Sequence, residues 1–216
     1  MFDFHCHSLL SDGELLPVEL IRRYQEKGYK AIAVTDHVDR SNIDTVIAGI
    51  LKFCSSLPDK GSLKILPGIE LTHLNLEDFG PLTDFARKKG IKVVVGHGET
   101  LVEPVVKGTN RAALEAGVDI LAHPGLISES DVKLAAKKGI FLELTSRKGH
   151  CLTNGHIAKM AAKFKVKIAL NNDSHLPPDI IAPSELVKVG LGAGLSQAQI
   201  DQIYRNLAIF LSKKLG

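Results

Sequence analysis

The sequence contains no tryptophan, and aromatic residues of all kinds make up only 5% of it. Proteins that hold single-stranded nucleic acid stack its bases on aromatic side chains, so this composition disfavours that role. Cysteine is also scarce: Cys6, Cys54 and Cys151 are odd in number and form no Cys-x-x-Cys pair. A disulfide framework is therefore not expected, and a reducing compartment is the default.

Two further features are missing, a signal peptide and an apolar run long enough to cross a membrane. Asp3 and two histidines stand where a signal peptide carries a basic and then an apolar region. The net charge of +3 is small and evenly spread along the chain, which gives no reason to expect a surface that coats nucleic acid. We expect a cytoplasmic protein without a membrane partner, and the sequence gives no oligomeric state.

The 216 residues, 44% of them hydrophobic and 24% charged, suit one domain spanning residues 1–216. One unit recurs: a helix-periodic segment, a glycine, then a short apolar run that ends in a polar side chain. The helical segments are expected at 17–27, 79–89, 110–116 and 130–138, and the apolar runs at 31–35, 91–95, 118–122 and 140–144. Apolar runs of this kind are typical of parallel strands buried on both faces.

Similar runs at 2–4, 63–69 and 166–170 raise the expected number of strands to about seven. Further helices are expected at 43–55 and 153–164, and a last one from a capping box at Ser196 to about residue 213. Alternating strands and helices fit an open doubly wound sheet or a closed barrel. Polar side chains follow nearly every strand rather than one switch point, so we favour the α/β barrel.

Histidines and carboxylates occupy these strand ends. His5 and His7 are two apart on the first strand, so their side chains share one face. The other candidates lie in the following loop or close to later strand ends: Asp12, His37, Glu70, His97, His123, Asp173 and His175. Imidazole and carboxylate ligands suit Zn, Mn or Fe, and nine such groups are about right for two to three divalent ions.

A lone histidine is more often a structural or surface residue than a metal ligand. Here the coincidence of eight such groups at strand ends defeats that reading. Asp36 and Asn172 adjoin candidate ligands, and we expect them to orient these ligands.

In these pieces the sequence resembles the polymerase and histidinol phosphatase (PHP) family of metal-dependent phosphoesterases. The matching pieces, in the family's order, are His5-Cys-His7 with Ser11-Asp-Gly13, Thr35-Asp-His37, Gly68-Ile-Glu70, His97, His123-Pro124 and Asp173-Ser-His175. The resemblance implies a distorted TIM-like barrel of seven strand–helix units, (β/α)7.

The resemblance also implies a ligand set for each ion. One ion would be held by His5, His7, Glu70 and Asp173; a second by Glu70 as a bridge with His97 and His123; and a third by Asp12, His37 and His175. Family members differ between Asp and His at the position of Asp12, so the third ion is the least secure.

Two cations, Arg147 and Lys148, follow the sixth expected strand, and we expect them to bind substrate phosphate. The expected reaction is hydrolysis of a phosphate ester by a metal-bound hydroxide, with Glu70 as bridging ligand. A phosphatase for small phosphomonoesters, such as histidinol phosphate or a nucleotide, is the first choice. The alternatives are a phosphodiesterase or 3'-5' exonuclease, with nucleic acid as a less favoured partner, and a non-catalytic metal-binding barrel.

Overall fold

In the part of the chain that the computed structural model describes, residues 1–57 and 63–216, seven parallel strands form a nearly closed barrel. In order around the barrel they are β1 (Phe2–Cys6), β2 (Ala31–Val34), β4 (Lys64–Leu71), β5 (Val93–His97), β6 (Ile120–Ala122), β7 (Phe141–Thr145) and β8 (Ile168–Asn171). This confirms the predicted α/β barrel. A two-residue strand that was not predicted, β3 (His37–Val38), pairs with the end of β4.

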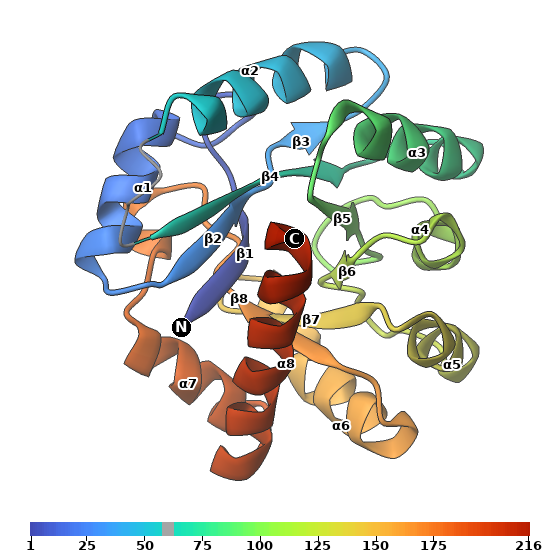
Figure 1. Ribbon diagram of the computed structural model, residues 1–216. Coiled ribbons are helices and arrows are strands. Elements are labelled where there is room, and N and C mark those ends of the chain that lie inside the picture. Colours follow the sequence, from blue (N-terminus) through green and yellow to red (C-terminus); the bar gives the residue numbers. More distant parts are fainter. Residues whose placement is uncertain (58–62) are drawn as a thin grey trace.

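Helices surround the strands (Figure 1). They are α1 (Pro17–Glu26), α2 (Ile43–Ser55), α3 (Phe79–Lys89), α4 (Thr109–Ala116), α5 (Glu129–Lys138), α6 (Asn154–Phe164), α7 (Pro183–Gly192) and α8 (Gln197–Leu215). Short 3-10 turns lie at η1 (Leu76–Asp78), η2 (His150–Thr153) and η3 (Pro177–Asp179). Of the helices, α7 was not predicted.

Every residue of β2, β5, β6, β7 and β8 is buried. One face of each strand fills the barrel interior and the other packs beneath the helices, which is why these strands read as continuous apolar runs. Side chains such as Val94 and Leu142 are fully buried in this core. The polar residues among them are therefore exceptions that need a structural or chemical reason.

The last helix, α8, lies across the barrel end at which the strands begin (Figure 1). The ring of Phe210 packs edge-on against Phe4 and Phe141, with centroid distances of 5.3 and 5.4 Å. The predicted capping box starts this helix, since the Ser196 hydroxyl accepts from the Gln199 amide and the Gln199 side chain accepts from the Ser196 amide. Helix α8 thereby covers this end of the barrel, and the opposite end carries the loops that follow the strands.

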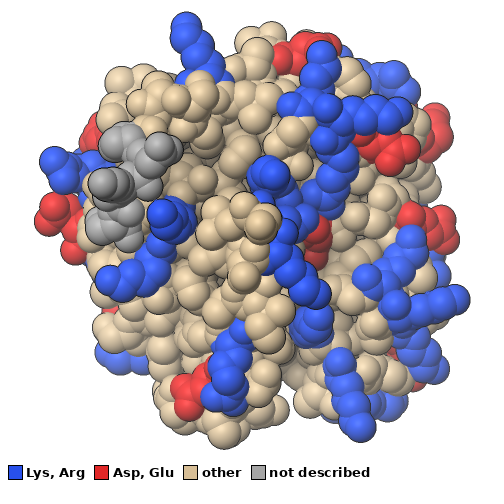
Figure 2. Space-filling view, viewed as in Figure 1, with Lys and Arg blue, Asp and Glu red and all other residues tan. Residues whose placement is uncertain are grey.

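Lysine and arginine side chains gather on the face that α8 covers (Figure 2). Four exposed lysines stand at or just before strand starts: Lys30, Lys64, Lys92 and Lys167. The charge that looks even along the sequence is therefore uneven in space. No helix in the described ranges is both long and apolar enough to cross a membrane.

Candidate metal centre

The first strand places two imidazoles inside the barrel. His5 and His7 are fully buried, and their ring centroids lie 5.0 Å apart. Cys6, between them, faces the other way, and its thiol donates to the carbonyl of Ala33. The alternation of a β-strand therefore produces the paired imidazoles, as predicted.

The barrel closes at this same position. The amide of His7 donates to the carbonyl of Ser174 at 2.9 Å, and the amide of Asp173 donates to the carbonyl of His5 at 3.0 Å. The seam between β1 and the end of β8 thus fixes the backbone of several candidate ligands at once. Asp173 has a positive φ of 54°, in the left-handed region where aspartate is tolerated better than most residues.

Glu70, at the end of β4, lies at the middle of the cluster. Its Oε2 atom is 3.3 Å from His5 Nε2, 3.6 Å from His7 Nε2 and 2.8 Å from His37 Nδ1. Its Oε1 atom is 3.6 Å from His123 Nε2. One carboxylate therefore faces four imidazoles, as a bridging ligand would.

Two further carboxylates complete the cluster. Asp173 Oδ1 lies 3.4 Å from His7 Nε2 and 3.7 Å from His5 Nε2. Asp12, in the loop after β1, reaches the other side, with its Oδ1 atom 3.3 Å from His175 Nε2 and 3.6 Å from His37 Nε2.

All nine predicted side chains meet at the carboxyl ends of the strands. Their donor atoms form overlapping groups, each with all atoms within 4.8 Å of one another. The groups are His5, His7 and Glu70; His5, His123 and Asp173; Glu70, His97 and His123; and His7, Asp12, His37 and His175.

Buried donor atoms without partners indicate that these residues suit metal ions. Within the described chain, both oxygens of Glu70, both ring nitrogens of His7 and the Nε2 atom of His5 are buried without a hydrogen bond. Buried polar atoms left this way cost free energy unless a ligand satisfies them. Nitrogen and carboxylate donors fit Zn, Mn or Fe.

For three of the candidate ligands, His7, His123 and Glu70, the electrostatics favour the state that binds a metal. Burial lowers the pKa of His7 well below its usual value, and the neighbouring His37 and His175 lower it further. Burial also lowers the pKa of His123, with His97 adding to the effect. Burial alone would raise the pKa of Glu70, but His5 and His37 hold it well below its usual range. Neutral imidazoles and an ionised carboxylate are the forms that bind a cation.

Glu143, which the sequence reasoning missed, supports the cluster from β7. Its Oε1 atom lies 2.8 Å from His5 Nδ1, and its Oε2 atom accepts from the His123 amide at 3.1 Å. Asn171 also donates to it. The signal was present in the sequence, because Glu143 is a lone carboxylate inside an apolar strand.

The two residues expected to orient ligands act less directly. Asp36 accepts from the amide and hydroxyl of Ser8 and from the hydroxyl of Ser11, each at 2.8 Å, so it holds the loop that carries Asp12. Asn172 donates to Asp3 and Tyr29, beneath the cluster. Among the described residues, neither side chain forms a hydrogen bond with the ring of a candidate ligand.

A cavity of about 330 Å³ opens over the cluster. Arg147 is among its lining residues, and its guanidinium lies 3.3 Å from Asp179 Oδ2 and 3.9 Å from Asp173 Oδ2. Lys148 is exposed and is not among the described residues that line this cavity. Of the two predicted phosphate ligands, the structure therefore places only Arg147 beside the cluster.

Glu103, from the loop between β5 and α4, also lines the cavity and was not predicted. It contacts His73, His97 and His150. Nothing in the local sequence around Glu103 indicates these contacts, which depend on how the loop folds.

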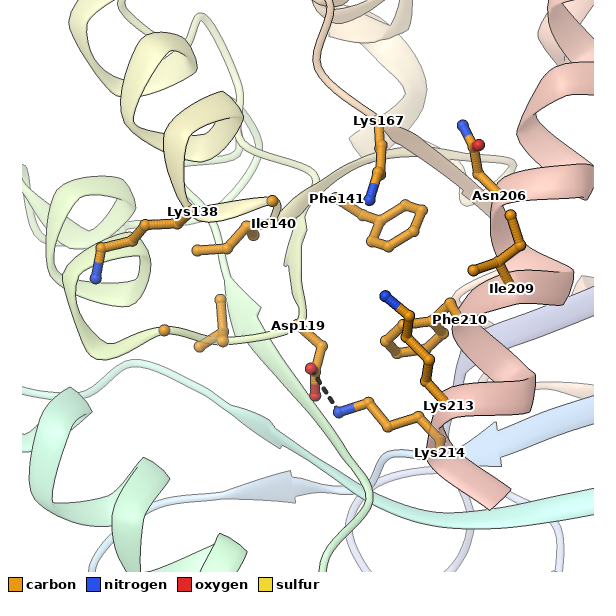
Figure 3. Close-up of a pocket in the computed structure, with 13 residues that line it drawn as sticks. Asp119, Lys138, Ile140, Phe141, Lys167, Asn206, Ile209, Phe210, Lys213 and Lys214 are labelled. Carbon is orange, nitrogen blue, oxygen red and sulfur yellow. Dashed lines mark hydrogen bonds and ion pairs between the residues drawn. The ribbon is translucent and has the colours of Figure 1, made fainter. Parts of the chain in front are cut away.

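A second hollow, of about 560 Å³, lies at the other end of the barrel (Figure 3). Lysines and apolar side chains line it, and Lys214 pairs with Asp119 at 2.7 Å. No histidine is among its lining residues in the described chain. The metal-type donors therefore belong to the cavity at the carboxyl ends of the strands.

The chain is similar to known proteins over most of its length. Residues 3–119 match the family model described as PHP domain. An uncharacterized protein of Methanocaldococcus jannaschii is 42% identical over 93% of both chains. A probable phosphatase of Thermoanaerobacter sp. (strain X514) is 30% identical over 91% of this chain and 88% of its own length. Ribonuclease P protein component 3 of Methanosarcina barkeri is 26% identical over 91% and 82%.

The fold also resembles a solved structure, histidinol phosphate phosphatase from Lactococcus lactis, with a TM-score of 0.61. That likeness covers 90% of this chain and 94% of the other at 18% identity. The crystal of that protein holds zinc, L-histidinol and phosphate. At this identity, the comparison supports the barrel fold alone.

Proposed function

The chain belongs to the PHP domain family, and from this we propose that it is a metal-dependent phosphatase acting on small phosphomonoesters. The observation that carries the proposal is the convergence of six histidines and two aspartates with Glu70 at the carboxyl ends of the strands. Active sites of α/β barrels lie at this end. A histidinol-phosphate-like compound or a nucleotide is the expected substrate class, in line with the phosphatase names among the relatives and the fold neighbour.

Two to three divalent ions fit the donor set. The bridging position would fall to Glu70, with His5, His7 and Asp173 on one side, His97 and His123 on another, and Asp12, His37 and His175 nearest the solvent. Bound ions of this kind lower the pKa of a coordinated water and neutralise charge on phosphate oxygens. The chain's part is to hold the donors in place.

Arg147 is suited to hold the substrate phosphate. Asp179 fixes the guanidinium beside the cluster, and the group is 27% exposed, so part of it faces the cavity. Guanidinium groups bind two oxygens of one phosphate in a fixed geometry and keep their charge at any physiological pH. Arg147 would therefore orient phosphorus and balance the charge that grows on its oxygens as the ester bond breaks.

The size of the cavity favours a small ester. About 330 Å³ lies at the low end of the range typical of sites for small molecules. His73 and His150 also line the cavity.

Hydrolysis of nucleic acid is the second candidate. The lysine-rich face in Figure 2 and the relative named as a ribonuclease P component favour it. That face lies at the barrel end opposite the cluster, so a strand bound there would not place its phosphates at the candidate metal centre. We therefore rank the phosphatase first.

Elemental analysis of the purified protein, paired with turnover assays, tests the proposal. Two to three ions per chain, with faster cleavage of p-nitrophenyl phosphate than of bis(p-nitrophenyl) phosphate under added Mn or Zn, would support a phosphatase. Faster diester cleavage would move the assignment to the second candidate. Bound metal without cleavage of either ester would indicate a non-catalytic barrel, and no metal after reloading would overturn the proposal.

A further inference from the structure

We propose that His73, His97 and Glu103 form an additional, outer metal position at the mouth of the cavity, which captures an ion from solvent and passes it to the inner cluster. This inference rests on the proposed function, because it assumes that the inner cluster binds metal. Donor atoms of the three residues lie within 4.8 Å of one another. Two of the three, His73 and Glu103, lie outside the nine ligands inferred from the sequence.

The spacing of these atoms is that of ligands around one ion. Glu103 Oε2 lies 2.9 Å from His97 Nε2 and 3.4 Å from His73 Nε2. Two donors bound to zinc at about 2.1 Å with a tetrahedral angle between them lie roughly 3.4 Å apart. The inner pairs of imidazole and carboxylate show the same range, for example 3.3 Å between His5 and Glu70.

The other oxygen of Glu103 has a separate support. Oε1 lies 3.2 Å from His150 Nε2, and the His150 side chain is 6% exposed. A carboxylate held this way keeps its remaining oxygen directed at His97 and His73. His150 thus positions Glu103.

The loop that carries Glu103 is braced at its base. The Glu99 carboxylate accepts from the amides of Gly108 and Asn110, each at 3.0 Å, and the Asn110 side chain accepts from the Glu99 amide. Gly125 packs so closely that an added Cβ would lie 1.9 Å from the Glu99 carbonyl oxygen. The base of the loop is thereby tied to the ends of β5 and β6, close to His97 and His123.

Exposure increases from the inner cluster to the outer position. The side chains of His5, His7 and Glu70 are fully buried, whereas Glu103 is 34% exposed and His73 is 46% exposed. An ion that enters the cavity past His73 and Glu103 therefore meets these donors before it reaches Glu70, whereas Asp12, 57% exposed, faces solvent elsewhere in the cluster.

His97 connects the two positions. It belongs to the outer group and also to the inner group with Glu70 and His123, and its side chain is only 3% exposed. An ion held outside can exchange Glu103 and His73 for Glu70 and His123 while one imidazole stays bound. Capture at the mouth would therefore speed the filling of the inner cluster.

Stopped-flow mixing of chelator-stripped protein with Zn²⁺ and a fluorescent zinc indicator measures this capture without any enzyme assay. Glu103→Gln and His73→Gln each remove one outer donor and keep a polar side chain of similar size. His156→Gln is the matched control, because His156 is a partly buried histidine whose Nε2 lies 3.0 Å from the Ile127 carbonyl and which belongs to no donor group. Thermal melts of each variant check the fold.

We expect both outer variants to take up zinc about tenfold more slowly than the wild type or more, by analogy with the loss of supporting groups at metal sites. Equilibrium dialysis should show the tightly held ions still present. Wild-type uptake rates in both variants would overturn the outer position. Slow zinc uptake by Glu103→Gln together with a wild-type uptake rate for His73→Gln would also overturn it, because Glu103 would then only orient His97. A wild-type chain that takes up no zinc would instead refute the proposed function.

Discussion

The Nδ1 atom of His5 lies 2.8 Å from Oε1 of Glu143, and both side chains are completely buried. Burial opposes a charge on His5, but Glu143 and Glu70 outweigh it and raise the pKa of the ring. A carboxylate on Nδ1 fixes the orientation of the imidazole and leaves Nε2 facing Glu70 at 3.3 Å. The geometry of the cluster therefore depends on Glu143, which is not one of the nine candidate ligands.

Replacing Glu143 with glutamine should weaken metal binding. The amide keeps the shape of the side chain but removes the negative charge that supports His5, so we expect zinc affinity to fall about 10- to 100-fold. Competition with a chelator of known affinity measures the change. Glu129→Gln, at an exposed ion pair with Lys163, is the control and should leave affinity unchanged. Equal affinities for the two variants would contradict the role of Glu143.

Replacing Glu70 with glutamine should have a larger effect, because one carboxylate faces four imidazoles. Glutamine offers a neutral oxygen and a nitrogen that cannot coordinate in its place. We expect the variant to lose at least one ion per chain and nearly all phosphomonoester turnover, measured by elemental analysis and a colorimetric assay. An unchanged metal stoichiometry would show that Glu70 is not a bridge.

The barrel was predictable because its signals are local. Glycine-terminated helices alternate with buried apolar runs, and each run needs only its neighbours to be recognised. Besides the unpredicted β3 and α7, several of the errors were at strand starts. Residue 91 was assigned to a strand, but the Ile91 amide donates to the Ala86 carbonyl and completes the end of α3, so β5 begins at Val93. The equivalent hydrogen bonds of the Val118 and Val166 amides complete the ends of the preceding helices, so β6 and β8 also begin two residues later than predicted.

The inner cluster was predictable for a similar reason. Parallel strands bring all their carboxyl ends to one end of a barrel. Ligands at the strand ends can therefore be predicted to lie together without any information on long-range contacts. Glu103 shows where such reasoning stops. Its contacts with His73 and His150 join residues 30 and more positions away through a loop, and no spacing in the sequence encodes that fold. The lysine-rich face had the same origin, since the barrel gathers charges that are separate along the chain.

Arg147 and Lys148 should differ although they are adjacent. Arg147→Ala should raise KM and lower kcat, together by about 2–4 kcal/mol in kcat/KM, because it removes a preorganised donor to the phosphate. Lys148→Ala should change either constant by less than twofold, since Lys148 is exposed and outside the cavity lining described above. Metal content should stay the same in both variants. Similar losses for both would mean that the loop rearranges when substrate binds.

Removing the metals should destabilise the whole barrel. The cluster lies on the seam where β1 meets the end of β8, so ions that bind His5, His7 and Asp173 also join the two strands that close the fold. An ion present at a thousand times its dissociation constant stabilises the folded state by about 4 kcal/mol.

For a domain of this size each kcal/mol shifts Tm by roughly 2–4 °C, so chelation should lower Tm by at least about 8 °C. Calorimetry of stripped and zinc-reloaded protein measures this shift. The comparison should include Asp173→Asn. This variant lacks one carboxylate ligand at the seam, so zinc should raise its Tm by less than it raises that of the wild type. If the Tm of the wild type does not change when zinc is added, the hydrogen bonds across the seam close the barrel without help from bound ions.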